Sequence, residues 1–216
     1  MCEVRPPIGG PLVGAHFIHY FRIKMMKSTC KHLVFVIVAI ALSMPLSSAW
    51  AATYYVSPQG NDGAAGTQAA PWKSLQQAAN KARAGDTVLV GDGVYAGFFT
   101  SHDGTEKAPI LFRANGNNVV IQSRNAATED NVNIEGTDYI VIDGFIVKSA
   151  KRGGIRVAES KGVLVQNNQV GPCQKWCIFT AFAPGIQILN NKAFDAMEQH
   201  GIYVSNSSGP NDNPVI

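Results

Sequence analysis

Ile140-Val-Ile142, Val163-Leu-Val165 and Ile186-Gln-Ile188 are three short apolar stretches whose first residues lie 23 positions apart. The pairs Asn167-Asn168 and Asn190-Asn191 follow the second and third stretches, again 23 positions apart. A stretch this short cannot bury its apolar face alone, whereas stacking the next turn on it buries a continuous core and completes the backbone hydrogen bonds. The repeat therefore predicts an all-β solenoid, a single-stranded parallel β-helix, in which each turn of the chain lies on the previous one.

The paired asparagines return at the same corner of successive turns. Amide side chains in such a position can donate and accept hydrogen bonds along the stack, which fixes the register of the turns. We therefore assign Asn167, Asn168, Asn190 and Asn191 a structural role. Less regular apolar stretches at 88–90, 110–112 and 119–121 are expected to form earlier turns.

Both ends of a solenoid need a cover, because its end turns otherwise expose apolar core. Residues 71–84 predict an amphipathic capping helix at the N-terminal end, and Gly85 is expected to end it. The predicted apolar face consists of Trp72, Leu75, Ala78, Ala79 and Ala82. At the other end the sequence stops at Val215-Ile216, inside an expected strand, so we expect a domain at 52–216 that is incomplete at its C-terminus.

Residues 1–51 are expected to be an N-terminal extension and a secretory signal peptide. Lys27 and Lys31 precede an apolar run at 33–42, and Ala49 and Ala51 are small residues that suit cleavage before residue 52. The alternative is a membrane anchor, but the run is shorter than the roughly 20 residues needed to span a bilayer. We therefore expect a secreted or periplasmic protein with no membrane attachment after cleavage.

The start of translation is open, because Met25 and Met26 directly precede the basic part of the signal and are alternatives to Met1. The net charge of +3 comes partly from this same segment. The sequence has no basic stripe with interleaved aromatic residues, so we expect no nucleic-acid partner.

Cys173 and Cys177 are the two cysteines that remain after the predicted cleavage. In an oxidising compartment a local disulfide between them is expected, with free thiols as the alternative. A zinc site would need four ligands, and His200 is the single further candidate nearby, so no metal site is assigned here.

The N-terminal part of the domain carries a resemblance to a known group of proteins. The residues concerned are Tyr54-Tyr-Val-Ser-Pro-Gln-Gly-Asn-Asp-Gly63, Gly66-Thr67, Pro71–Ala78, Ala84–Val90 and Gly93–Tyr95. They resemble secreted right-handed parallel β-helix proteins of the pectate lyase type, including chondroitinase B-like polysaccharide lyases. The resemblance implies a right-handed β-helix and an acidic polysaccharide as partner.

Calcium is a cofactor that the resemblance implies, because lyases of this group often hold it through clustered aspartates. The sequence shows no such cluster, since Asp62, Asp86 and Asp92 belong to the first turns. Such lyases also use Lys or Arg as a base. No cofactor is evident from the residues themselves, and we expect a monomer.

A second series of strands predicts where a ligand binds. Ile134, Ile155, Ile178 and Ile202 each begin a strand-like stretch, at successive steps of 21, 23 and 24 in the numbering. If these residues point inward, their successors point outward and form a column about 4.8 Å apart. The expected column is Glu135, Arg156, Phe179 and Tyr203. An Arg fork suits a uronate carboxylate, and aromatic faces suit sugar rings.

The loop 195–201 is expected to bring Asp195, Glu198 and His200 beside this column. Cleavage of a uronate by β-elimination needs a base, an acid and a group that neutralises the carboxylate. We predict His200 and Tyr203 for proton transfer and Arg156 for the carboxylate. Glu135, Phe179 and Glu198 are predicted to contact the substrate. The alternative for His200 is a corner residue paired with Glu198, and an ordinary exposed sheet face is the alternative for the column.

Lys148, Lys151 and Arg152 add positive charge at the turn before Arg156, either attracting a polyanion or forming a solvated loop. The leading hypothesis is a polysaccharide lyase. The alternatives are a non-catalytic surface or adhesin module, a uronate C5-epimerase and a glycoside hydrolase on the same fold.

Overall fold

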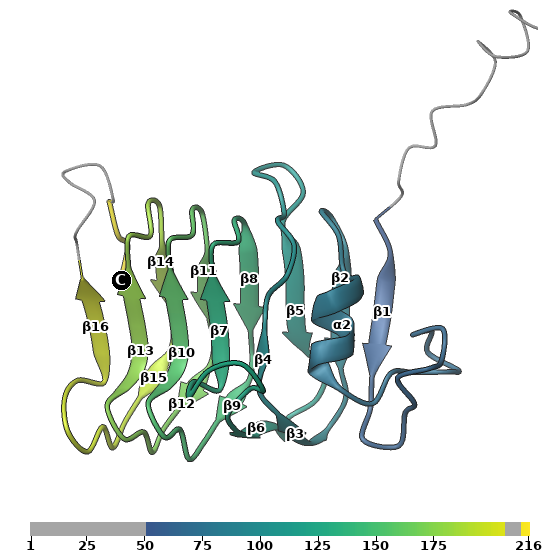
Figure 1. Cartoon of the computed structure of the whole chain (residues 1–216), viewed down its shortest axis with the longest axis horizontal. Coiled ribbons are helices and arrows are strands. Elements are labelled where there is room, and N and C mark those ends of the chain that lie inside the picture. Colours follow the sequence, from purple (N-terminus) through teal and green to yellow (C-terminus); the bar gives the residue numbers. More distant parts are fainter. Residues whose placement is uncertain (1–50, 206–212) are drawn as a thin grey trace, which may run out of the picture. The chain divides into compact units, whose positions relative to one another are not determined.

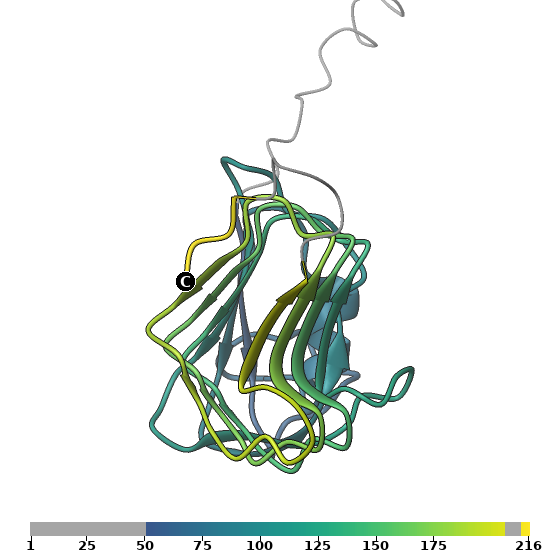
Figure 2. The same ribbon diagram turned by 90° about the vertical axis from the view of Figure 1, so that its left-hand side faces the viewer.

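The computed structural model describes residues 51–205 and 213–216, and these form a solenoid of about five turns. Three parallel sheets line its sides, and from β2 onwards successive strands of the chain visit them in the same order (Figure 1). Seen along the stack, the turns superpose around a common interior (Figure 2). The prediction of an all-β parallel solenoid is therefore confirmed. The predicted signal peptide lies outside the described residues.

The sheets are named here in the order in which the chain reaches them. Sheet 1 contains β1 (Thr53–Val56), β2 (Thr87–Val90), β5 (Ile110–Ala114), β8 (Ile140–Asp143), β11 (Leu164–Gln166) and β14 (Gln187–Leu189). Sheet 2 contains β3 (Gly93–Ala96), β6 (Val119–Ser123), β9 (Ile146–Val147), β12 (Gln169–Val170) and β15 (Lys192–Ala193). Sheet 3 contains β4 (Phe98–Phe99), β7 (Val132–Glu135), β10 (Gly153–Ala158), β13 (Trp176–Ala181) and β16 (Ile202–Ser205).

The period of the apolar stretches sets the register of sheet 1. Val165 pairs with Ile142 on one side and with Ile188 on the other, and the exposed fraction of each of these side chains is 3% or less. Alternate residues of each strand thus point into a continuous core, where three phenylalanines are the largest of the side chains exposed by less than 2%. These are Phe98, Phe112 and Phe145.

The second series follows the same period, and here one predicted alignment is wrong. Ile155 pairs with Val132 on one side and with Ile178 on the other, whereas Ile134 lies against Val157. The sequence pattern instead places residue 134 opposite residue 155. The two alignments differ by two residues. Because strand side chains alternate with a period of two, the same side chains point inward in both. The alternation of inward and outward residues therefore could not reveal the difference, whereas a step of 23 positions back from Ile155 reaches Val132.

The asparagine ladder has the predicted structural role. Asn168 is 1% exposed, donates its amide N–H to Ile142 O and accepts the backbone N–H of Phe145. Asn191 repeats the pattern one turn later, donating to Val165 O and accepting from Asn168. Beside them Asn167 and Asn190 have positive φ angles of 57° and 55°, a left-handed conformation that Asn tolerates better than most residues.

The capping helix is shorter than predicted. The helix α2 (Leu75–Lys81) begins after Ser74, whose hydroxyl accepts the N–H of Gln77, and it ends before Gly85 is reached. It packs against β1 and β4, and the predicted apolar face is buried from Trp72 to Ala82. Trp72 itself is in extended backbone that pairs with Val56.

The chain returns to sheet 1 after the last complete turn. Val215 pairs in parallel with Gln187 of β14, through backbone hydrogen bonds with Ile186 and Ile188. Across residues 51–205 and 213–216, none of the helices has both the length and the apolar character of a membrane span.

Removing one amide of the ladder should destabilise the solenoid. Asn168→Ala leaves a buried carbonyl and a buried N–H without partners, so we expect a loss of about 2–4 kcal/mol in the free energy of unfolding. Gln169→Ala, at the exposed next residue, should change it by less than about 0.5 kcal/mol. Urea unfolding followed by circular dichroism measures both, and equal midpoints would contradict the assigned role.

Candidate polysaccharide-binding face

The outer face of sheet 3 carries the predicted column, except that Asn133 takes the place predicted for Glu135. Arg156 pairs in register with Phe179, and Phe179 pairs with Tyr203. On the other side Arg156 lies against Asn133, and Glu135 lies against Ala158. Glu135 is therefore not the column neighbour of Arg156, although it still reaches Arg156 diagonally. Counting one full repeat back from Arg156 would have identified Asn133.

Four aromatic side chains form a continuous row on this face. The ring centroids are 4.6 Å apart between Trp176 and Phe179, 5.7 Å between Phe179 and Tyr203, and 5.2 Å between Tyr203 and His200. Tyr203 is 39% exposed, His200 is also exposed, and Trp176 and Phe179 are half-buried. The row presents flat apolar rings with polar edges, which is a surface that suits sugar rings. We call these four residues the aromatic row.

Trp176 was not predicted as a site residue. It stands in Cys-Gln-Lys-Trp-Cys, between the two cysteines, and its β13 position pairs with Gly153. Lys175 Nζ lies 5.7 Å from the centre of the Trp176 ring, which is a cation–π distance. The sequence did contain a signal for Trp176, since this residue lies between the two cysteines and three positions before Phe179.

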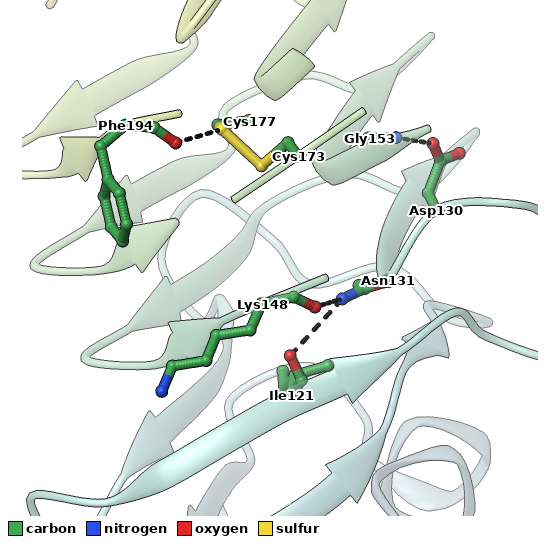
Figure 3. Close-up of a disulfide and its surroundings, with 8 residues drawn as sticks. All are labelled: Ile121, Asp130, Asn131, Lys148, Gly153, Cys173, Cys177 and Phe194. Carbon is green, nitrogen blue, oxygen red and sulfur yellow. Dashed lines mark hydrogen bonds between the residues drawn. A yellow bond between two sulfur atoms is a disulfide. The ribbon is translucent and has the colours of Figure 1, made fainter. Parts of the chain in front are cut away.

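Cys173 and Cys177 are joined by a disulfide in the structure, with their Cα atoms 5.4 Å apart (Figure 3). Both are buried, and Cys177 Sγ lies 3.3 Å from the carbonyl oxygen of Phe194 in the next turn. A Cβ on Gly154 would approach Cys177 O to 2.7 Å, so a glycine is needed beneath this loop. The disulfide closes the loop that contains Lys175 and Trp176, and Trp176 contacts Phe179 in the aromatic row.

Arg156 does not offer its full charge to solvent. Its Nη1 lies 2.6 Å from Glu135 Oε2 and donates a hydrogen bond of 3.1 Å to Asn133 Oδ1. Its guanidinium carbon lies 5.9 Å from the centre of the Phe179 ring. The hydrogen bond from Arg156, with a further one from Asn133, lowers the pKa of Glu135 below its ordinary value of 4.5.

Arg152, predicted as part of a basic turn, is also paired. Its guanidinium donates to both oxygens of Asp130, a fully buried carboxylate. Asp130 also accepts the N–H of Gly153 (Figure 3). The hydrogen bond to Asp130 raises the pKa of Arg152. The neighbouring Asn131 donates to Ile121 O and Lys148 O and so ties the turn to sheet 2. This part of the turn is therefore structural, while Lys148 and Lys151 remain exposed.

The three predicted residues of the loop before β16 have three different environments. His200 lies against Tyr203, as predicted. Glu198 Oε1 instead accepts a hydrogen bond of 2.6 Å from Gln174 Nε2, which links successive turns, so it does not pair with His200 as the alternative required. Asp195 has a φ of 53° and serves the turn through its backbone carbonyl, which accepts the N–H of Cys173.

The described residues do not fit a calcium site. Calcium takes about six to eight oxygen ligands, usually with several carboxylates. In residues 51–205 and 213–216 no three Asp, Glu, His or Cys side chains are grouped closely enough to hold an ion. Glu135, the carboxylate beside the aromatic row, is engaged by Arg156.

Comparison with known proteins now identifies the family. Residues 54–209 match the family described as the Pel9A-like, right handed beta helix region, and the chain belongs to it. The expected right-handed β-helix of pectate lyase type is thereby confirmed.

Two curated proteins match part of the sequence. An uncharacterised protein of Bacillus subtilis, YwoF, is 36% identical over 100 residues, which is 44% of this chain and 21% of the relative. Pectate lyase PEL9 of Emericella nidulans is 43% identical over 75 residues, which is 33% of this chain and 18% of the relative. The matched part of the chain thus spans about a fifth of each relative.

Solved structures share the fold at low sequence identity. The pectate lyase Pel9A superposes with a TM-score of 0.61 at 18% identity, covering 70% of this chain and 43% of that one. An alginate lyase from Paenibacillus sp. str. FPU-7 gives 0.57 at 20% identity, covering 73% and 51%. At this identity the likeness establishes the β-helix fold.

The pairing of Glu135 with Arg156 should make stability depend on pH. The pKa of Glu135 is lowered by folding, so the pair stabilises the folded state above about pH 4.5 and is lost as pH falls through the lowered value. Both side chains are partly exposed, so solvent screening limits the effect to about 1 kcal/mol or less. Unfolding of the protein and of Glu135→Gln across pH 3–7 measures it; a constant difference between the two would contradict the pairing.

Removing the disulfide should loosen the Trp176 loop. The closed loop is short, so chain entropy predicts a loss of about 2 kcal/mol for the double change Cys173→Ala and Cys177→Ala. Trp176 should also become more exposed, with a red-shifted emission spectrum. A Trp176→Phe background is the control, because the shift should vanish there; a shift that persists would locate the change elsewhere.

Proposed function

We propose that this chain forms the substrate-binding part of an exported polysaccharide lyase that acts on a uronic-acid-containing polysaccharide by β-elimination. The observation that carries the proposal is the aromatic row on the outer face of sheet 3. Its four rings come from two adjacent turns, Trp176 and Phe179 from β13 and His200 and Tyr203 from the next turn, and the contact between Phe179 and Tyr203 joins the two turns along the solenoid axis. A polysaccharide chain is a repeating ligand that suits such a surface.

Family membership and fold support the same class of function. The family takes its description from Pel9A, one structural neighbour is named a pectate lyase and another an alginate lyase. A fold by itself does not define an activity, because function resides in sites carried by the fold. The chemistry is therefore argued from the residues of sheet 3.

Proton transfer is assigned to His200 and Tyr203. Both are exposed and their rings are in contact, so a sugar placed on the aromatic row would meet an imidazole and a phenol together. An imidazole can remove the proton next to the uronate carboxyl group, and a phenol can protonate the leaving oxygen. Arg156 would contact the carboxyl group of the sugar, and Glu135 is its partner in the unbound protein.

A non-catalytic binding module is the second candidate. The observation that favours it is the ion pair of Arg156, which leaves the aromatic row to supply most of the binding surface. Such a module would bind polysaccharide through the same four rings. It would release no product.

Incubation with polygalacturonate, alginate or chondroitin sulfate tests the proposal. We expect the ultraviolet absorbance of an unsaturated product with one of them, and His200→Ala or Tyr203→Phe should lower the rate by about tenfold or more. His102→Ala, in the loop before β5 near the N-terminal end, is the matched control and should leave the rate unchanged.

Trp176→Ala should weaken polysaccharide binding by about three- to tenfold, because one ring of the aromatic row is lost. Binding without product on any of the three polymers, with and without added calcium, would contradict the lyase and support the module. No binding at all would overturn both.

A further inference from the structure

The carboxylate of Glu135 is held at the place where a ligand carboxylate would bind Arg156. Glu135 Oε2 accepts from Arg156 Nη1 at 2.6 Å and from Asn133 Nδ2 at 3.2 Å. Asn133 is 5% exposed and also accepts from Arg156, so three side chains close one hydrogen-bonded ring. The Arg156 side chain is 19% exposed, which leaves little of it for a ligand.

The neighbouring cations Arg152 and Lys175 each have another partner. Arg152, the Arg that precedes Arg156 along the chain, is bound by the buried Asp130. Lys175 lies over the Trp176 ring. A free uronate carboxylate at the turn of Arg156 would therefore meet one guanidinium that already has an anionic partner. The carboxylate of Glu135 would repel the carboxylate of the ligand, and partial burial strengthens this repulsion.

We propose that Glu135 is a specificity-determining residue, which makes the turn of Arg156 accept a sugar unit whose carboxyl group is esterified or absent. The inference rests on the proposed function of sheet 3 as a polysaccharide surface and adds a charge preference at one position along it. The ring of Phe179 beside the guanidinium remains suited to an uncharged sugar. An exchange of Glu135 for Gln would convert this position to one that favours a free carboxylate.

The test compares two probes that differ only in charge. These are an oligogalacturonate and its fully methyl-esterified form, with binding measured by calorimetry. The protein should bind the ester at least as tightly as the acid. In Glu135→Gln the ratio of the two affinities should move towards the acid by about threefold or more, since an exposed ion pair is removed.

Glu106→Gln is the matched control, because it removes the same charge from an exposed position in the loop before β5. It should leave the ratio of affinities unchanged. An unchanged ratio in Glu135→Gln, or a move towards the ester, would overturn the proposal. An equal move in both variants would also overturn it, because the effect would then be one of net charge.

A second measurement does not depend on polysaccharide binding. The Arg156 Nε–H resonance, identified by its loss in Arg156→Lys, is followed by NMR during titration with acetate. It should shift in Glu135→Gln and remain in place in the unaltered protein at the same acetate concentration. Equal shifts in both would overturn the role of Glu135. If neither sugar probe binds, the proposed function fails, and the acetate titration still decides whether Glu135 blocks Arg156.

Discussion

The parallel pairing of each turn with the next, at a constant spacing along the chain, is the constraint on which the rest of the structure depends. Val165 in sheet 1 and Ile155 in sheet 3 each pair with the corresponding residues of the turns before and after them. The same spacing places Asn168 over Asn191 at the corner between sheets 1 and 2. Buried apolar side chains supply the driving force, and the amide ladder fixes which residues face one another.

The same register determines which side chains adjoin one another on the outer face of sheet 3. Arg156, Phe179 and Tyr203 adjoin one another because their inward neighbours are in register. The Cys173–Cys177 disulfide adds a local restraint that the repeat does not provide, and it brings Trp176 onto Phe179. Core packing and a covalent link thus combine to form a surface of four rings, while the ion pair of Glu135 and Arg156 sets the charge at one end.

The sequence was sufficient to predict the fold, because a repeat of short apolar stretches has few solutions that bury them. It also placed Arg156, Phe179, Tyr203 and His200 on one face. It did not predict that Glu135 would bind Arg156, since that contact depends on a diagonal approach between β7 and β10. The pairing of Glu198 with Gln174 was missed for a similar reason, as it joins two loops whose paths the strand pattern does not define.

The constant spacing between paired turns also has a consequence for how the chain acquires its structure. Each turn needs only the one before it as a template, so every long-range contact in the regular part closes a loop of similar, short length. Assembly can then proceed one turn at a time from α2 and β1 while later residues are still unfolded.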